Sequence, residues 1–317
     1  MNTLIRIAEV WVPTEDGASL ELSSGWFPGA SAFEAITRQM LFARGEGLPG
    51  RAWEVGHPLM MRELSGSYFK RAAAAKAIDL TCAVAWPVFQ GDALLCVVVL
   101  LMGGAATSVG TVELWRNDAR ISPDMTLMDG YFGSGAQAAE LEALTRDGWL
   151  PRGTGAPGLA WQTGQTVCIA DIASSSRFLR KEAALALGIG RAMALPCSVR
   201  DTSSWVLALL SAPSKPIALR VEVWSQQPGR PDDLVRISGF CESAGELPTG
   251  AGTVHKLEAL GAVGTAWRTG VAQASTQWPT PDTPEDRQAL QALGAQSVLA
   301  LPVLMDDAVN EVVALYF

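Results

Sequence analysis

The sequence predicts an α+β fold in which one domain-sized unit occurs three times. The motif Gly-x-x-Gly-x-x-Trp-x-x-Gly is found at 47–56, 155–164 and 261–270. A Glu-x-Trp triplet precedes each motif, and a proline that closes an apolar segment follows it. The copies lie 108 and 106 residues apart, far beyond the roughly 20–50 residues of a solenoid repeat. We therefore predict three tandem domains at residues 1–107, 108–215 and 216–317.

The elements of one unit follow in order from local patterns. An opening strand is expected where apolar and polar residues alternate, as at 219–224, because successive side chains of a strand point to opposite faces. A turn and a second strand follow, and then a helix, which is clearest at 137–146 and is reduced to a stub at 255–260. After the glycine motif we expect a short strand, a second helix and two closing strands.

The glycine motif itself does not indicate a phosphate-binding loop. A nucleotide fingerprint needs a helix that opens after the last glycine, or a Gly-Lys-Ser/Thr sequence, and neither occurs here. We interpret the motif as structural, with its glycines in turns and its tryptophans in the core. The residues concerned are Gly50, Gly158, Gly264, Trp53, Trp161 and Trp267.

Bulk composition excludes several classes of protein. The net charge of -8 and the pI near 4.9, without any basic run, argue against nucleic-acid binding. The N-terminus does not resemble a signal peptide, and the longest apolar run, 93–102, is too short to span a bilayer. Five cysteines without CxxC spacing indicate neither a disulfide framework nor a zinc site. We expect a cytoplasmic protein that does not associate with membranes.

The ordered series of motifs resembles the GAF domain, three times over. The segments that match best are 45–58, which contains the first glycine motif, and Gly-x-x-Ser-x-x-Ala-x-Pro-Val at 294–303. The resemblance implies, for each unit, an antiparallel sheet with helices and loops over one face, often around a small-molecule pocket. It also implies a sensory or dimerising role in bacterial signalling. Unlike typical members, the units are expected to lack flanking terminal helices, and we expect no kinase, cyclase or DNA-binding segment beside them.

Catalytic chemistry is not indicated. Some GAF-like domains are cysteine-dependent methionine sulfoxide reductases, which need an attacking and a resolving thiol near one pocket. The cysteines of this chain are scattered at unmatched positions. The two histidines, His57 and His255, are also unmatched and have no third partner of a catalytic triad. We therefore expect no enzymatic activity, no metal site and no cofactor.

The missing flanking helices predict contacts between sheets. The closing strands are apolar on both faces, as at 97–101, and such strands need cover on both sides. Another sheet must supply this cover, either in a pseudo-threefold arrangement within the chain or across a homodimer. Three first-strand tryptophans share a face with glutamates, opposite the Val/Leu face, and we predict that they lie in these contacts: Trp11, Trp115 and Trp224.

If a unit binds a ligand, we expect the second unit to do so. Arg191 alternates onto the same face of its strand as Met193, and a guanidinium in a pocket could bind the carboxylate or phosphate of a small anionic metabolite. Trp161 and Arg180 complete this candidate site. The alternative interpretations are an arginine that extends to solvent at a strand end and a solvated helix face.

These patterns favour a non-enzymatic, bacterial-type regulatory protein that senses a small molecule or binds a protein partner. Self-association into a homo-oligomer is also expected. The alternative is a structural or oligomerising scaffold whose pockets are filled by side chains and hold no ligand.

Overall fold

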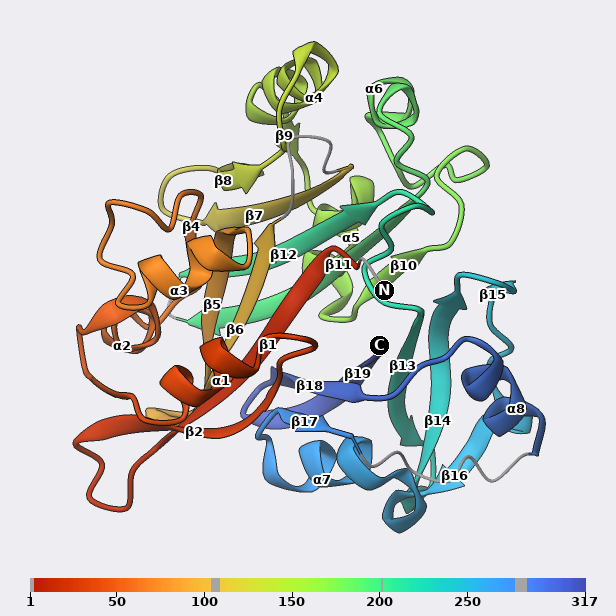
Figure 1. The fold of residues 1–317 in the computed structure, drawn as a ribbon. Coiled ribbons are helices and arrows are strands. Elements are labelled where there is room, and N and C mark those ends of the chain that lie inside the picture. Colours follow the sequence, from red (N-terminus) through yellow and green to blue (C-terminus); the bar gives the residue numbers. More distant parts are fainter. Residues whose placement is uncertain (1–2, 104–108, 201, 277–283) are drawn as a thin grey trace.

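The computed structural model describes residues 3–103, 109–200, 202–276 and 284–317, which form three antiparallel sheets with helices (Figure 1). The expected α+β class is observed. In each sheet the first strand of the unit pairs with its last strand, so that one strand order occurs three times. The sheets fall within the three predicted units. The first predicted boundary, at 107/108, lies outside the described residues, and the division into separate domains stays a prediction.

The strand order is the same in all three sheets. The first sheet, in the order β3-β2-β1-β6-β5-β4, consists of β1 (Ile5–Pro13), β2 (Ser19–Trp26), β3 (Leu41–Ala43), β4 (Leu59–Met61), β5 (Leu80–Gln90) and β6 (Ala93–Gly103). The second, in the order β10-β11-β12-β7-β8-β9, consists of β7 (Gly110–Asp118), β8 (Met125–Tyr131), β9 (Trp149–Leu150), β10 (Val167–Ile169), β11 (Arg191–Arg200) and β12 (Ser203–Ser211). The third, in the order β15-β14-β13-β19-β18-β17, consists of β13 (Arg220–Gln227), β14 (Arg230–Cys241), β15 (Gly245–Glu246), β17 (Gln273–Ser275), β18 (Val298–Met305) and β19 (Ala308–Tyr316), and β16 (Val254–Lys256) pairs with β14 beside this path.

Helices follow the strands at matching places in the first two units. The helices of the first unit are α1 (Ser31–Thr37), α2 (Gly47–Val55) and α3 (Ala72–Ala77), and those of the second are α4 (Ala136–Arg146), α5 (Gly155–Thr163) and α6 (Lys181–Ala186). The third unit has the 3-10 turns η1 (Ala251–Thr253) and η2 (Leu257–Leu260), then α7 (Gly261–Thr269) and α8 (Pro284–Ala292). The expected helix at 137–146 is thus α4, and the stub in the third unit forms β16 and η2.

The glycine motif forms a helix in every unit (α2, α5 and α7), which differs from the turns expected from its glycines. The last glycine of each motif ends the helix in the left-handed conformation, where a glycine has no steric penalty. Their φ angles are +70° at Gly56, +64° at Gly164 and +67° at Gly270.

The second glycine of each motif allows its helix to pass close to a preceding backbone carbonyl. A Cβ atom at that glycine would collide with the carbonyl oxygen. The contact would be 2.1 Å to Ala43 O at Gly50, 2.6 Å to Pro151 O at Gly158 and 2.0 Å to Leu257 O at Gly264. The motif tryptophans Trp53, Trp161 and Trp267 were expected in the core, and they pack at equivalent places against the three helix-side cores, where each is partly buried.

Each sheet has one face toward its own helices and one toward the other two sheets. The helix side of every unit holds a separate apolar core. The opposite faces of all three sheets meet in one shared core, to which each unit contributes residues such as Val98, Leu207 and Leu301, all at most 1% exposed. The expected sheet-to-sheet packing within the chain is therefore observed.

The first-strand tryptophans do not lie between the sheets, and that part of the expectation is wrong. Trp11, Trp115 and Trp224 are buried in the helix-side cores. The alternation of the strand was assigned correctly, but the face that receives the helices is the Glu/Trp face. The Val/Leu face, which needs no polar partners, is the one that joins the units.

The units follow one another around a pseudo-threefold axis (Figure 1). The penultimate strands β5, β11 and β18 contact one another at the centre. At the periphery, Arg62 beside β4 forms an ion pair with Asp129 of β8 at 2.7 Å, β10 lies against β14, and β17 lies against β2. Each unit thus contacts the next through corresponding strands, and the third returns to the first.

Candidate functional site

Each unit buries a charged cluster between its sheet and its helices. In the first unit the Glu9 carboxylate is fully buried and accepts hydrogen bonds from Trp11 Nε1 at 2.9 Å and from Arg71 Nη2 at 3.0 Å. Arg71 also donates through Nη1 to the second carboxylate oxygen and, at 2.7 Å, to Thr37 Oγ1. The guanidinium therefore supplies the counter-charge that a buried carboxylate requires.

The second unit repeats this arrangement. Glu113 accepts from Trp115 Nε1 at 2.9 Å and from Arg180 Nη1 and Nη2 at 2.7 and 2.8 Å. Arg180 also donates to Thr145 Oγ1, at the position that Thr37 has in the first unit. The Arg180 side chain remains 15% exposed, whereas that of Arg71 is 1% exposed. The second cluster is thus slightly closer to solvent.

The third unit keeps the glutamate and the tryptophan but takes its arginines from strands. Glu222 accepts from Trp224 Nε1 at 3.0 Å, from Arg236 Nη1 at 2.8 Å and from Arg220 Nε at 2.7 Å. The Tyr316 hydroxyl donates to the same carboxylate at 2.9 Å. Burial, followed by the nearby Glu222 charge, raises the pKa of Tyr316 well above its ordinary value, so this hydroxyl stays a donor.

These clusters occupy the space between sheet and helices, where the resemblance to GAF domains implies a small-molecule pocket. The charges inside are paired with one another, and aromatic side chains surround them, such as Phe33 and Phe69 beside the Arg71 guanidinium. Among the described residues, aromatic rings therefore pack beside the arginine of the cluster in every unit.

Arg191 and Met193, two of the predicted ligand-binding residues, lie on the side of the sheet that faces the other units. Arg191 Nε donates to Glu242 Oε2 at 2.8 Å, and its Nη1 donates to Ala170 O. This ion pair connects the second unit to the third. Met193 is fully buried in the shared core. The strand face that was expected to line a pocket is instead the face that joins the units.

The other two predicted residues, Trp161 and Arg180, lie on the helix side, so the predicted site does not assemble. Arg180 belongs to the buried Glu113 cluster described above. Trp161 is half-buried at the edge of a shallow depression of about 480 Å³, and the Arg152 guanidinium carbon lies 5.4 Å from the centre of its ring. Trp161 and Arg180 thus lie on the opposite face of the second sheet from Arg191 and Met193.

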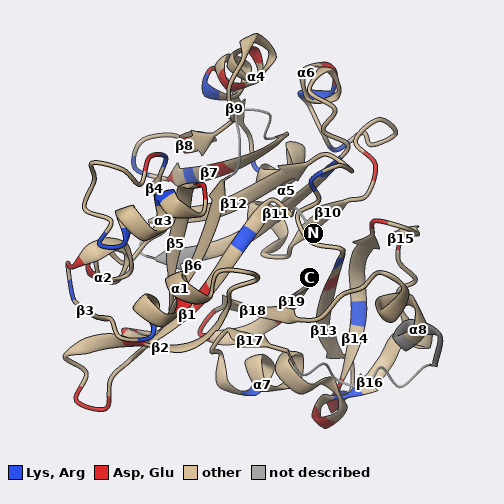
Figure 2. Cartoon of the chain, in the orientation of Figure 1, with Lys and Arg blue, Asp and Glu red and all other residues tan. Residues whose placement is uncertain are grey.

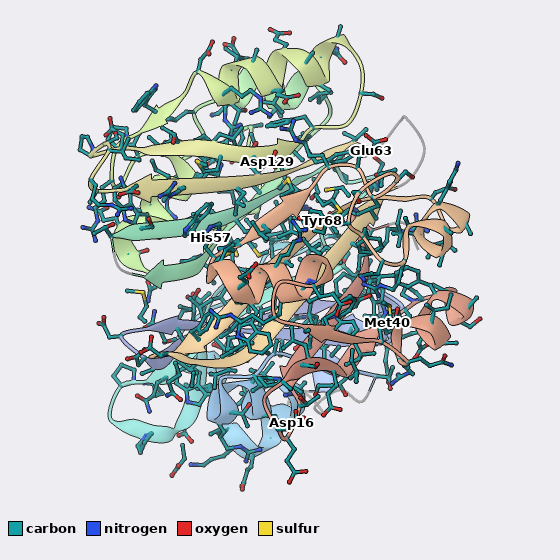
Figure 3. All side chains as sticks on the ribbon, turned by 90° about the vertical axis from the view of Figure 1, so that its left-hand side faces the viewer. Asp16, Met40, His57, Glu63, Tyr68 and Asp129 are labelled. Carbon is teal, nitrogen blue, oxygen red and sulfur yellow. The ribbon has the colours of Figure 1, made fainter. Side chains whose placement is uncertain are left out.

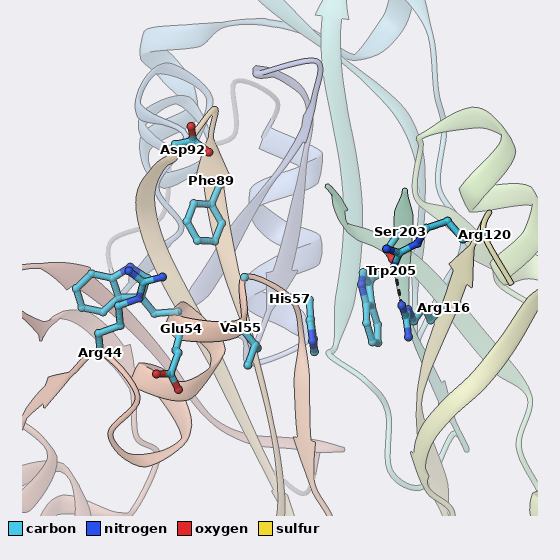
Figure 4. A pocket seen from close by; sticks show the side chains of 12 residues that line it. Arg44, Glu54, Val55, His57, Phe89, Asp92, Arg116, Arg120, Ser203 and Trp205 are labelled. Atoms are coloured by element: carbon cyan, nitrogen blue, oxygen red, sulfur yellow. Dashed lines mark hydrogen bonds between the residues drawn. The ribbon is translucent and has the colours of Figure 1, made fainter. Parts of the chain in front are cut away.

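A cleft of about 540 Å³ lies between the first and second units (Figure 4). The first unit contributes the C-terminal end of α2, with the residues beside it, and the β5–β6 hairpin. The second unit contributes β7, the turn after it, and the start of β12. Figure 3 shows His57 at the boundary between the two units. The charged residues that line the cleft are Arg44, Glu54, Asp92, Arg116 and Arg120.

A stack of three side chains crosses the boundary at this cleft. The His57 ring lies parallel to the Trp205 ring, with centroids 4.6 Å apart and an interplanar angle of 12°. The Arg116 guanidinium carbon lies 5.5 Å from the centre of the Trp205 ring. His57 Nδ1 is 3.0 Å from Pro58 O, and it is the donor of this contact because a carbonyl oxygen only accepts. The stack positions the walls of the cleft relative to each other.

The second unit gives its side of the cleft a positive charge. The Asp118 carboxylate accepts from Arg120 Nε and Nη2 at 3.0 and 2.9 Å and from Arg116 Nη2 at 2.5 Å. The hydrogen bonds from Arg120, with the charges of both arginines, hold the pKa of Asp118 well below its ordinary value. Arg116 also donates to Ser203 Oγ at 3.3 Å (Figure 4). Two guanidinium groups therefore face one carboxylate there, whereas basic and acidic residues are interspersed along the chain as a whole (Figure 2).

The cysteines lie in apolar surroundings. Burial raises the pKa of the Cys96, Cys168 and Cys197 thiols to about 12, and it raises that of Cys82 further. Thiols with such pKa values are protonated at neutral pH and are poor nucleophiles. Among the described residues, no group of three or more His, Cys, Asp or Glu side chains could hold a metal ion. None of the helices in this part of the chain is long and apolar enough to cross a membrane.

Comparisons with known proteins find partial likeness to solved structures. No family model and no curated protein matches the chain. The nlh2 GAF domain of A. aeolicus, in an inactive state, is 16% identical, with a TM-score of 0.26, over 32% of this chain and 59% of its own. The free methionine-R-sulfoxide reductase of Neisseria meningitidis, in complex with its substrate, is 21% identical, with a TM-score of 0.24, over 32% and 51%. The GAF domain of a phosphoenolpyruvate-protein phosphotransferase from Coxiella burnetii is 15% identical, with a TM-score of 0.26, over 31% and 56%.

These matches include GAF domains, and each covers about a third of this chain and between 51% and 59% of the other. The three antiparallel sheets, each with helices on one face, are consistent with a GAF-like fold. At these identities and TM-scores, the likeness identifies neither a ligand nor an activity.

Sequence reasoning missed the cleft between the units. Its residues come from segments that no local pattern connects, since His57 and Trp205 lie in different units. The sequence does contain one feature that marks this location: the residue after the last glycine of the motif differs in each copy, as His57, Gln165 and Val271. Only the packing of the units shows that this variable position lies at a contact between them.

Proposed function

We propose that this chain is a non-enzymatic regulatory protein that binds a small anionic molecule in the cleft between its first two units. The observation that carries the proposal is the convergence of arginines from both units, Arg44 on one side and Arg116 and Arg120 on the other, on one cavity of about 540 Å³. This volume lies within the range of roughly 300–1,000 Å³ that is usual for small-molecule sites.

The charge distribution indicates which kind of molecule fits. A carboxylate or phosphate would lie toward Arg116 and Arg120, because the planar guanidinium group binds both kinds of anion through paired hydrogen bonds. Glu54 and Asp92 line the cleft from the first unit and would accept hydrogen bonds from hydroxyl or amino groups. The preferred ligand therefore carries both an anionic group and hydrogen-bond donors.

A regulatory role fits a ligand that bridges two units. A molecule held by residues of both units stabilises their relative position by a free energy that grows with the logarithm of its concentration relative to its Kd. The non-enzymatic part of the proposal is supported by the raised pKa values of four thiols and by the packing of the histidines. His57 stacks on Trp205, and His255 contacts Trp224 edge-on at 5.3 Å, so both imidazoles pack against indoles. The cytoplasmic location stays a prediction.

Isothermal titration with inorganic phosphate and with citrate tests the site. We expect one binding event per chain, weakened about tenfold in Arg44→Ala and in Arg120→Ala, since a hydrogen bond to a charged group contributes about 1.5–3 kcal/mol. Arg146→Ala is the matched control, because Arg146 forms an exposed pair with Glu142 on α4. Equal affinities in all three variants, at constant ionic strength, would place binding outside the cleft.

The second candidate function is a structural scaffold without a ligand. The internally paired charged clusters and the shared apolar core favour it. Native mass spectrometry of the protein from its natural host separates the two candidates, because it reports retained ligands and oligomeric state together. A chain that retains no small molecule, binds neither phosphate nor citrate, and self-associates would be a scaffold.

A further inference from the structure

One position recurs at the three contacts between units and carries a different residue each time. Cys96, Trp205 and Glu311 each follow the proline of the preceding strand by nine residues and are at most 5% exposed. In the sheets, Arg116 pairs with Trp205 as Ser225 pairs with Glu311. The three side chains therefore occupy one equivalent position under the pseudo-threefold symmetry.

Each of these side chains contacts the neighbouring unit just after the glycine that ends its motif helix. Trp205 stacks on His57, which follows Gly56. The Cys96 thiol is beside the backbone of Ala272, which follows Gly270 by two residues. The Glu311 carboxylate contacts Thr166, which follows Gly164 by two residues. An indole and a thiol thus fill two of the positions, and a carboxyl group fills the third.

The Glu311 carboxyl group has partners for only one of its oxygens. Oε1 accepts from the Thr166 backbone N at 2.6 Å and also from Thr166 Oγ1. Oε2 is buried and has no hydrogen-bond partner among the described residues. The side chain is fully buried, and no ion pair with a Lys, Arg or His is found for it in this part of the chain. This contrasts with Glu9, Glu113 and Glu222, whose carboxylates all pair with arginine.

The groups around Glu311 do not neutralise a negative charge. In the sheet it is paired with Ser225 of β13 and Val303 of β18, which do not titrate. From β10 it is faced by Cys168, whose thiol is protonated at neutral pH because burial raises its pKa to about 12. The neighbouring Asn310 donates from Nδ2 to Gly164 O at 3.1 Å. A protonated carboxyl group fits these surroundings better than a carboxylate does.

We propose that the contact between the second and third units is a pH-sensitive joint, held closed by protonated Glu311 and loosened when this carboxyl group ionises. The inference does not depend on a ligand in the cleft between the first and second units. The other two joints, with Cys96 and Trp205, have no group at this position that ionises near neutral pH.

The direction in which pH changes the strength of this contact follows from the raised pKa of Glu311. Burial raises the pKa of Glu311 from its ordinary 4.5 to about 7, although the hydrogen bonds from Thr166 lower it. A group whose pKa is raised in the closed state binds more protons there than in the open state. The joint is therefore tightest below about pH 4.5, loosens as the pH rises toward 7, and changes little above that value.

Hydrogen exchange of the segment 164–169, corrected for the intrinsic rate, tests the joint. In the unaltered protein the opening constant should rise by up to about tenfold per pH unit between pH 5 and 7. Glu311→Gln keeps an acceptor and removes the titration, so this slope should vanish. Glu140→Gln, which removes an exposed carboxylate on α4, should leave it unchanged. A flat profile in the unaltered protein, or the same slope in Glu311→Gln, would overturn the proposal.

A second measurement does not depend on the folding of a variant. The side-chain carboxyl carbon of Glu311, followed by carbon-13 NMR in the unaltered protein, should titrate with a midpoint near 7. A midpoint near the ordinary value of 4.5 would show that the carboxylate is accommodated as a charge, and the joint would then not respond to pH in the proposed range.

Discussion

The two faces of each sheet are both buried, but they are buried in different ways. The face under the helices carries a glutamate, a tryptophan and at least one arginine, joined by directed hydrogen bonds. The face shared by the three sheets is built mainly from apolar residues such as Val98, Leu207 and Leu301. A buried charge is tolerated only with particular partners, whereas apolar surface joins any complementary apolar surface. The helix side therefore specifies the geometry within a unit, and the shared side holds the units together.

The largest expected effect concerns the charged face. Arg71→Ala should lower the free energy of unfolding by about 3–5 kcal/mol, because it leaves the Glu9 carboxylate buried without a counter-charge. Urea denaturation measures the change. The double variant Glu9→Gln with Arg71→Met should recover a large part of the loss, since it removes both charges. A loss below about 1 kcal/mol for Arg71→Ala would mean that the pair contributes no more than a surface ion pair.

A cavity in the shared core should act on more than one unit. Leu207→Ala should cost about 2–5 kcal/mol, as is typical for truncation of a buried leucine. Because the core is common to all three sheets, hydrogen-exchange protection should fall in β5 and β18 as well as in β12. Loss of protection confined to the second sheet would show that the units are energetically independent.

The close approach of the motif helices predicts a smaller effect on the helix side. Gly264→Ala should cost about 1–3 kcal/mol, because the new Cβ would lie 2.0 Å from Leu257 O and the helix would have to shift. Gly252→Ala is the matched control, since a Cβ there would meet nothing within 4 Å. Thermal unfolding of both variants measures the difference, and equal midpoints would contradict the steric argument.

The smallest effect should come from an ion pair outside both buried faces. Arg38 and Glu34 lie one helical turn apart on α1, with 2.7 Å between Nη2 and Oε1, and the Arg38 side chain is 54% exposed. Arg38→Ala should cost about 0.3–0.5 kcal/mol at low salt, and raised ionic strength should reduce this cost. A loss comparable to that of Arg71→Ala would remove the distinction between buried and exposed pairs.

Local sequence patterns were sufficient to predict most helices and strands, but they were insufficient to predict the cleft between the first two units. Helical spacing identified α4, and the alternation of the first strands placed Glu9 and Trp11 together on one face. The glycine motif was misread, because glycine is usually a poor helix former and its value here is to let a helix pass close to a carbonyl. The cleft near His57 could not be predicted, since its walls come from two units.

The sequence by itself determined that one unit occurs three times, because the spacing of landmarks along the chain does not depend on how the chain packs. It also indicated that the closing strands are buried on both faces. Only the tertiary structure decided which face receives the helices and which joins the units. That choice depends on partners distant in the chain, such as Glu9 and Arg71, which are separated by 62 residues. Alternation along a strand defines two faces, but it does not show which face will contact the arginine that neutralises its glutamate.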